Sequence, residues 1–298
     1  MADLTPGSPE WARRVTASKV AAILGVSPFD SPRSVWHLMR GDVPIWGGND
    51  ATRRGHYLED GVLAWWRDRY GIPHEPGVEY VLQPLYTLGD WAAATPDMLA
   101  CHPDHDNVLV DAKTTTMDDE WGTPGTDQVP THYYAQALWA MHLSGIHQFH
   151  FAVLHSRLRF EEYVVAYDAE QGAALQAKMR EFYDSLDSDE PPALSDSLAD
   201  FQTMRRLHPD IADKTQPDHS VDITEDDARA LLGAVADLAD AEAADRLHRS
   251  RVLAQMGRAQ FALCNGIKVA RRQANKNGIS FVPLPKNLPL LTDMENAS

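Results

Sequence analysis

The feature that most constrains this chain is a pair of acidic motifs, Pro96-Asp97 and, fourteen residues later, Asp111-Ala112-Lys113. The second motif lies in the run 107–114, which predicts a β-strand. Side chains alternate between the two faces of a strand, so Asp111 and Lys113 should share one face. Two carboxylates can bind a hard divalent cation through oxygen, and a nearby lysine can orient water and offset phosphate charge. The pattern indicates phosphodiester chemistry, with ordinary surface charge as the alternative.

A third acid lies in a predicted helix upstream. Asn49 is a suitable N-cap and Gly71 a suitable C-terminal glycine, so we expect a helix from Asp50 to Tyr70. Glu59 falls in the middle of this helix, beside an apolar side formed by Leu58, Val62, Trp65 and Trp66. Glu59 is therefore a candidate metal ligand, and the alternative is a solvated helix glutamate.

A second helix is predicted downstream, with Thr131 as its cap and Gly145 at its end. Tyr133 and Gln136 are three residues apart and therefore lie on one helix face. The Gln136 amide could hydrogen-bond a nucleophilic water or a phosphate oxygen. The alternative is a solvated glutamine.

These motifs appear in the order found in a known family. The pieces are Trp11-Ala12-Arg13-Arg14, Thr16-Ala17-Ser18, 22–29, Gly55-His56-Tyr57-Leu58-Glu59, Thr95-Pro96-Asp97, Asp111-Ala112-Lys113 and Tyr133-Tyr134-Ala135-Gln136. Over residues 11–167 the chain resembles the lambda-exonuclease/YqaJ-like viral recombinase family of the PD-(D/E)xK nucleases. It departs from the family in having Asp111 where glutamate is more usual, and Met98-Leu99 where Gly-Leu is more usual.

The resemblance assigns roles to particular residues. Glu59, Asp97 and Asp111 would bind metal together with the Ala112 carbonyl. Lys113 would position and activate water, with Gln136 assisting.

The resemblance also implies a pocket for a DNA 5′-phosphate, formed by the Thr16-Ala17-Ser18 turn and a preceding arginine, Arg13 or Arg14. A guanidinium can bind phosphate through two hydrogen bonds. A serine at a helix start can donate beside free backbone N–H groups. Spacing leaves the choice of arginine open, although Arg14 is nearer the turn.

The function implied by the resemblance is a metal-dependent 5′-to-3′ exonuclease on linear double-stranded DNA, using Mg²⁺ or Mn²⁺. It would leave a 3′ single strand for a single-strand annealing protein, and the enzyme would be a homo-oligomeric ring. Three alternatives stay open: a DNA endonuclease of the same superfamily in restriction or repair, a noncatalytic DNA-binding recombination scaffold, and an RNA nuclease.

Charge is unevenly distributed along the chain. The net charge of −16 opposes DNA binding, and residues 187–245 contain sixteen acidic and four basic residues. Residues 246–286 contain nine basic residues and no acid. Lys268, Arg271 and Arg272 in this basic segment, and Tyr133 near the acidic motifs, are predicted to contact DNA. Neutralisation of the acidic stretch is an equal alternative for the basic segment.

The predicted element order suits a restriction-endonuclease-like α/β fold, a mixed central sheet flanked by helices. The expected nuclease core is 9–186, followed by a linker or crossing segment at 187–223. A long helix or a broken pair, and then a small basic hairpin, form the extension at 224–286. No apolar run reaches 18 residues and no signal pattern begins the chain, so we expect a protein of the bacterial host cytoplasm, not of the membrane. Two cysteines are too few for a disulfide framework or an iron–sulfur cluster.

Overall fold

The computed structural model describes residues 4, 8–45, 47–73, 79–103, 106–216, 218–276 and 278–291. The chain divides into two compact units, Met1–Ile211 and Ala212–Ser298. The first unit contains the three acidic candidates and Lys113, and the second contains the basic segment.

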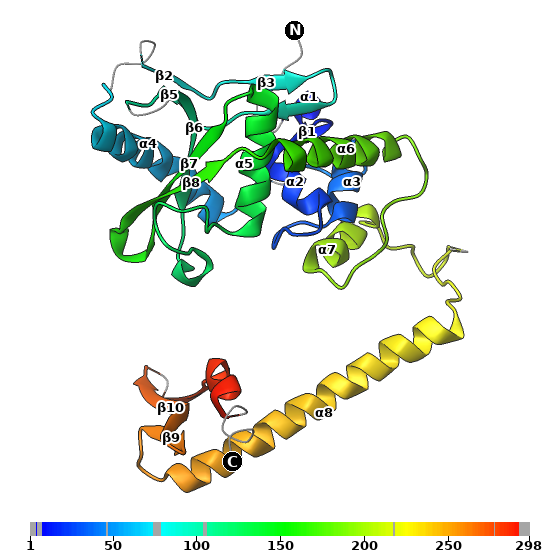
Figure 1. Cartoon of the computed structure of the whole chain (residues 1–298). Helices are drawn as coiled ribbons and strands as arrows, with labels where there is room; N and C mark the ends of the chain where they lie inside the picture. Colours follow the sequence, from blue (N-terminus) through cyan, green and yellow to red (C-terminus); the bar gives the residue numbers. More distant parts are fainter. Residues whose placement is uncertain are drawn as a thin grey trace. The chain divides into compact units, whose positions relative to one another are not determined.

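The first unit is built on a five-stranded mixed sheet of order β2-β5-β6-β7-β8 (Figure 1). Its strands are β2 (Tyr80–Leu82), β5 (Met98–Cys101), β6 (Asn107–Thr114), β7 (Gln148–Leu154) and β8 (Phe160–Ala166). β6 and β7 are parallel, and the other neighbouring pairs are antiparallel. The predicted mixed α/β fold is confirmed.

The two faces of this sheet are covered by different helices. α4 (Asp50–Tyr70) places Val62, Leu63 and Trp66 against Val108 and Val110 of β6. The opposite face packs on α5 (Thr131–Ser144), whose Leu138 and Trp139 belong to one core with Leu109, Phe149 and Phe151. The alternation of β6 side chains between two apolar layers explains why this strand is apolar on both sides until Asp111.

The N-terminal segment packs beside α5. It contains α1 (Pro9–Ala12), β1 (Val15–Thr16), α2 (Ala17–Ile23) and α3 (Pro32–Arg40). β1 joins β4 (Ala92–Ala94) and β3 (Tyr86–Leu88) in a small second sheet, and α2 packs on α5. α6 (Ala169–Ser185) also packs on α5, and α7 (Leu198–Leu207) packs on α3. Neither the small sheet nor α7 was predicted.

Several predicted helix ends are confirmed by their capping contacts. The Asn49 side chain accepts from the amides of Ala51 and Thr52, and Gly71 ends α4 in the left-handed conformation at φ 65°. The prediction that Thr131 caps α5 was wrong. Pro130 occupies the N-cap position without a side-chain hydrogen bond, and Thr131 is the first helical residue.

The second unit contains one long helix and a three-stranded antiparallel sheet. α8 (Glu225–Met256) is continuous, so the alternative of a broken pair was wrong. The strands are β9 (Phe261–Cys264), β10 (Ile267–Asn275) and β11 (Gly278–Pro283), in the order β11-β10-β9. The predicted hairpin is confirmed and is extended by one strand. No helix in the described ranges is long and apolar enough to cross a membrane.

Candidate active site

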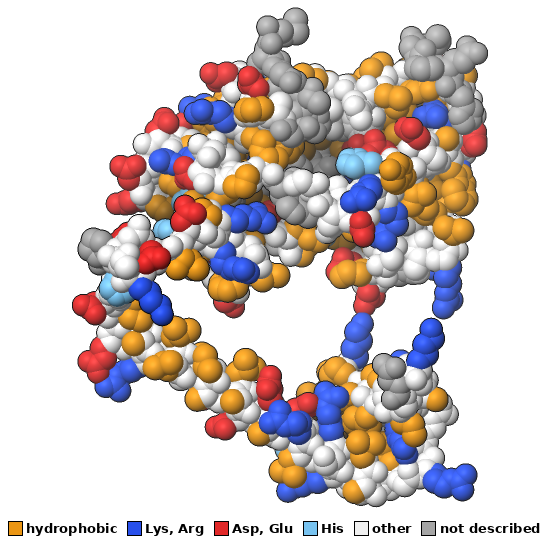
Figure 2. Space-filling model, turned by 180° about the vertical axis from the view of Figure 1, so that it is seen from behind, with side chains coloured by type: hydrophobic (Ala, Val, Ile, Leu, Met, Phe, Trp, Pro, Cys, Tyr) orange, Lys and Arg blue, Asp and Glu red, His pale blue; other side chains and the backbone are white. Residues whose placement is uncertain are grey.

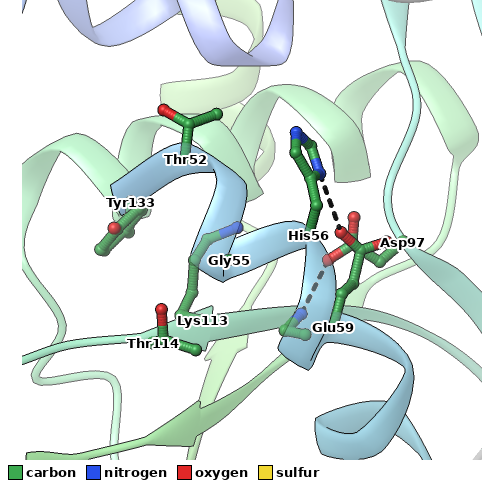
Figure 3. A pocket seen from close by; sticks show the side chains of 9 residues that line it. Thr52, Gly55, His56, Glu59, Asp97, Lys113, Thr114 and Tyr133 are labelled. Carbon is green, nitrogen blue, oxygen red and sulfur yellow. Dashed lines mark hydrogen bonds and ion pairs between the residues drawn. The ribbon is translucent and has the colours of Figure 1, made fainter. Parts of the chain in front are cut away.

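A pocket of about 320 Å³ lies between α4, α5 and the ends of β5 and β6. Its lining residues are Thr52, Gly55, His56, Glu59, Asp97, Ala112, Lys113, Thr114 and Tyr133. Figure 3 shows Glu59 and Asp97 close together, with Lys113 and Tyr133 on the other side of the pocket. The structure thus brings residues from four separate motifs of the sequence into one pocket.

Asp111 is the centre of the hydrogen-bond network beneath this pocket. Its side chain is 2% exposed. Its Oδ2 accepts hydrogen bonds from Lys113 Nζ at 2.8 Å and from Gln136 Nε2 at 2.6 Å. Its Oδ1 accepts from the Asp97 amide at 3.0 Å. These contacts compensate the burial of the carboxylate and fix its orientation.

Asp97 faces Asp111 because their strands are neighbours in the sheet. Met98 of β5 pairs with Val110 of β6, which places the preceding Asp97 beside the following Asp111. Asp97 Oδ2 accepts from the Ala112 amide at 2.8 Å. Burial, together with the negative charges of Asp111 and Glu59, raises the pKa of Asp97 to about 8. The site therefore concentrates negative charge that a cation would stabilise.

Lys113 is held as a cation at the pocket wall. Burial opposes its charge, but Asp111 and Asp97 together raise its pKa above the ordinary lysine value. The ammonium lies 5.4 Å from the Tyr133 ring centroid and 5.9 Å from that of Phe151. At neutral pH this group can donate hydrogen bonds and offset negative charge, and it cannot accept a proton.

Glu59 reaches the pocket from α4, one turn after His56. The His56 Nδ1 and Glu59 Oε2 atoms are 3.8 Å apart, and the Glu59 side chain is 24% exposed. His56 was not predicted as a pocket residue. Its spacing of three residues before Glu59 on a helix was the available signal, because such residues share a helix face.

The donor chemistry of the pocket fits a hard divalent cation, since Glu59, Asp97 and Asp111 all offer carboxylate oxygens. Burial and the charges of Asp111 and Glu59 raise the pKa of Asp97, and a bound cation would favour its carboxylate form. The three carboxylates do not converge on a single point, however. No group of three His, Cys, Asp or Glu side chains among the described residues is arranged to hold a metal ion, and Asp111 is directed to Lys113 and Gln136.

Arg13, Arg14 and Ser18 lie on the N-terminal segment and do not line this pocket. Arg13 and Ser18 are exposed, whereas Arg14 is half-buried and donates from Nη1 to the Gly89 carbonyl at 3.1 Å. The Ser18 hydroxyl is 3.1 Å from the Thr16 hydroxyl. A polar turn at the start of α2 thus contains Arg14, Thr16 and Ser18.

The three basic residues predicted to contact DNA from the second unit lie on β10. Lys268 and Arg271 are exposed, and the Lys268 ammonium lies 4.5 Å from the centroid of the Phe261 ring. Arg272 is half-buried and donates to the Gly257 carbonyl. Lys and Arg side chains gather on this unit in Figure 2.

Residues 11–147 match the YqaJ-like viral recombinase domain. The chain is similar to an alkaline exonuclease, LHK-Exo from Laribacter hongkongensis, with 18% identity over 61% of this chain and 94% of that one, at a TM-score of 0.45. It is also similar to a phage related exonuclease from Haemophilus somnus 129PT, with 14% identity over 59% and 96% of the two chains, at a TM-score of 0.42. No curated protein matches the chain.

Proposed function

Because residues 11–147 of this chain belong to the YqaJ-like viral recombinase family, we propose that the protein is a metal-dependent exonuclease on linear double-stranded DNA. It degrades the 5′-ended strand and leaves a 3′ single strand for recombination by strand annealing. The observation that carries the proposal is the contact of Lys113 with Asp111, with Asp97 and Gln136 bonded to the same carboxylate.

The proposed metal ligands are Glu59, Asp97 and Asp111, with the Ala112 carbonyl as a further oxygen donor. These oxygens would hold a divalent cation, Mg²⁺ or Mn²⁺, which would lower the pKa of a coordinated water and offset charge on the phosphate. The departure from the family at Asp111 is accommodated by its neighbours: Lys113 and Gln136 contact the shorter side chain directly.

The side chains on β6 and α5 act on water and phosphate. Lys113 is a permanent cation in this setting, because Asp111 and Asp97 raise its pKa. It orients the attacking water and stabilises the negative charge that builds on the phosphate as water attacks. Gln136 holds Asp111 in place through its amide and can donate its remaining N–H to the water or to a phosphate oxygen.

The DNA end is bound by the turn that precedes α2. Arg13 or Arg14 pairs with the 5′-phosphate, and the Ser18 hydroxyl donates to it. Tyr133 lines the pocket and contacts the substrate with its ring. Lys268, Arg271 and Arg272 of β10 bind phosphates of DNA. The proposal includes a homo-oligomeric ring, a single-strand annealing protein as partner and a site of action in the bacterial cytoplasm.

Three substrates test the function: a linear duplex labelled at its 5′ ends, the same duplex labelled at its 3′ ends, and a covalently closed circle. Each is incubated with Mg²⁺ and with EDTA. The proposal expects Mg²⁺-dependent early release of the 5′ label as mononucleotide, retention of the 3′ label on a shortening strand, and intact circles. Cleavage of the circles would instead identify an endonuclease. DNA binding without cleavage of any substrate would identify a noncatalytic scaffold.

A further inference from the structure

Lys19 is a buried lysine outside the catalytic pocket. It lies on α2, directly after Ser18, and is 5% exposed. Its ammonium donates to three backbone carbonyls, those of Trp11 at 3.1 Å, Ala12 at 2.8 Å and Arg14 at 2.7 Å. It also lies 4.3 Å from the centroid of the Trp11 ring. Three donors and three acceptors satisfy the ammonium completely.

The three carbonyls belong to the turn that presents the two arginines. Trp11 and Ala12 end α1, Arg13 follows as its C-cap, and Arg14 leads into β1. Lys19 therefore hydrogen-bonds to the backbone on both sides of Arg13. A cation at the end of a helix is also favoured by the exposed carbonyls there.

A charge in this position has a cost for folding. Burial lowers the pKa of Lys19 to about 7, because the ammonium has lost its water. An apolar side chain of similar volume would fill the site without that cost. What such a side chain could not do is fix the carbonyls of Trp11, Ala12 and Arg14 by hydrogen bonds.

The hydrogen bonds of Lys19 also connect the Arg13–Arg14 turn to α2, the helix that carries Ser18. The hydroxyl groups of Thr16 and Ser18 hydrogen-bond to each other next to this turn. Arg14 donates a hydrogen bond to the Gly89 carbonyl. The relative position of an arginine and a serine decides whether both can bond one phosphate, because guanidinium recognition of phosphate requires fixed geometry.

We propose that Lys19 is a positioning residue for DNA 5′-phosphate recognition: it locks the Arg13–Arg14 turn against the start of α2, where Ser18 lies. This inference rests on the proposed function, since it presupposes that the turn binds a 5′-phosphate. Lys19 itself reaches no ligand, because its three protons are directed to the protein backbone.

The test is the preference of the enzyme for a 5′-phosphate, measured as the ratio of KM values for duplexes with 5′-hydroxyl and 5′-phosphate ends. Lys19→Met keeps the length of the side chain and removes its donors, and the exposed Lys178→Met is the matched control. We expect Lys19→Met to lower the ratio about tenfold, with a larger change in KM than in kcat, as loss of a charge-assisted contact predicts. The control keeps the wild-type ratio.

Thermal melting of each variant separates unfolding from loss of preference. If Lys19→Met does not fold, Lys19→Gln replaces it, since glutamine keeps two donors without the charge. A folded Lys19 variant with the wild-type ratio overturns the inference. A wild-type enzyme with equal KM for both ends instead removes the 5′-phosphate pocket from the proposed function, which is a different failure.

Discussion

Gln136 of α5 donates a hydrogen bond of 2.6 Å to Asp111 of β6, across the interface between the helix and the sheet. This contact joins residues 25 positions apart in the sequence and bonds Oδ2 of the Asp111 carboxylate, whereas the Asp97 amide bonds Oδ1. The nuclease site therefore depends on the packing of α5 on the sheet as well as on the strand that carries Asp111 and Lys113.

Gln136→Ala should lower kcat for linear DNA by about 10²-fold, the usual cost of losing one positioned donor at a phosphate or oxyanion site. The fold should be retained, because Gln136 is half-buried and is not part of the apolar core. Steady-state cleavage and thermal melting measure the two effects. Gln171→Ala, on the exposed side of α6, is the control, and equal rates for both variants would contradict the role of Gln136.

Glu162 is predicted to hold α4 against the sheet. Its Oε1 accepts from Trp66 Nε1 at 2.5 Å and from His150 Nδ1 at 2.7 Å, and its Oε2 accepts from Tyr70 at 2.6 Å. Glu162→Gln removes the negative charge and leaves one carbonyl oxygen where two carboxylate oxygens accept hydrogen bonds. We expect a loss of about 1–3 kcal/mol in the free energy of unfolding. Urea denaturation measures it, with the exposed Glu170→Gln as control.

The Glu162 carboxylate should also make the free energy of unfolding depend on pH, and its pKa gives the direction of this dependence. Burial acts to raise the pKa of Glu162, but hydrogen bonds from His150, Tyr70 and Trp66 outweigh it and lower that pKa below the ordinary value. The stability contributed by an acid with a lowered folded pKa is present above its unfolded pKa and is lost as pH falls through the folded pKa. Between pH 7 and pH 3, Glu162→Gln should lose less stability than the wild type; an equal loss would mean that Glu162 does not titrate as described.

Divalent cations should stabilise the folded protein. Binding only to the native state raises stability by about 2.7 kcal/mol at a hundredfold excess over Kd, so Mg²⁺ should raise Tm and EDTA should remove both the rise and the activity. Asp97→Asn should abolish most of the rise, whereas the exposed Asp187→Asn should keep it. The same Mg²⁺ response in Asp97→Asn and wild type would place the cation elsewhere.

The basic residues of β10 lead to a separate prediction about how DNA affinity depends on salt concentration. If Arg271 contacts a DNA phosphate, Arg271→Ala should reduce the slope of log Kd against log salt by about 1. Fluorescence anisotropy with a labelled duplex, without divalent metal, measures this slope. Arg229→Ala, in an ion pair with Glu225 on α8, serves as control. An unchanged slope for Arg271→Ala would favour the alternative that β10 only balances the acidic stretch.

The sequence was most informative where one short segment carries its own signal. The run 107–114 predicted a strand, and the alternation of side chains along a strand placed Asp111 and Lys113 on one face. Asn49 and Gly71 predicted both ends of α4. The small sheet of β1, β4 and β3 was not predicted, because strands of two or three residues are too short to show a period. Thr131 was predicted to cap α5, but Pro130 occupies the N-cap position without a side-chain hydrogen bond.

Contacts that depend on backbone groups were the hardest to foresee. Lys19 follows the serine of a motif that the sequence did single out, but its partners are carbonyl groups, which any residue supplies. Likewise, the apposition of Asp97 and Asp111 depends on the register of β5 with β6, which is set by the burial pattern of both strands.

The most direct measurement of the central claim is cleavage of a 5′-phosphorylated linear duplex by Lys113→Ala beside Lys178→Ala, both in Mg²⁺ and both checked by thermal melting. Lys113 contacts Asp111 at the pocket, and Lys178 pairs with Glu181 on the surface of α6. The account predicts that Lys113→Ala binds DNA but cleaves it at least about 10²-fold more slowly, while Lys178→Ala cleaves at the wild-type rate. A folded Lys113→Ala enzyme with wild-type cleavage would place the nuclease chemistry outside this pocket.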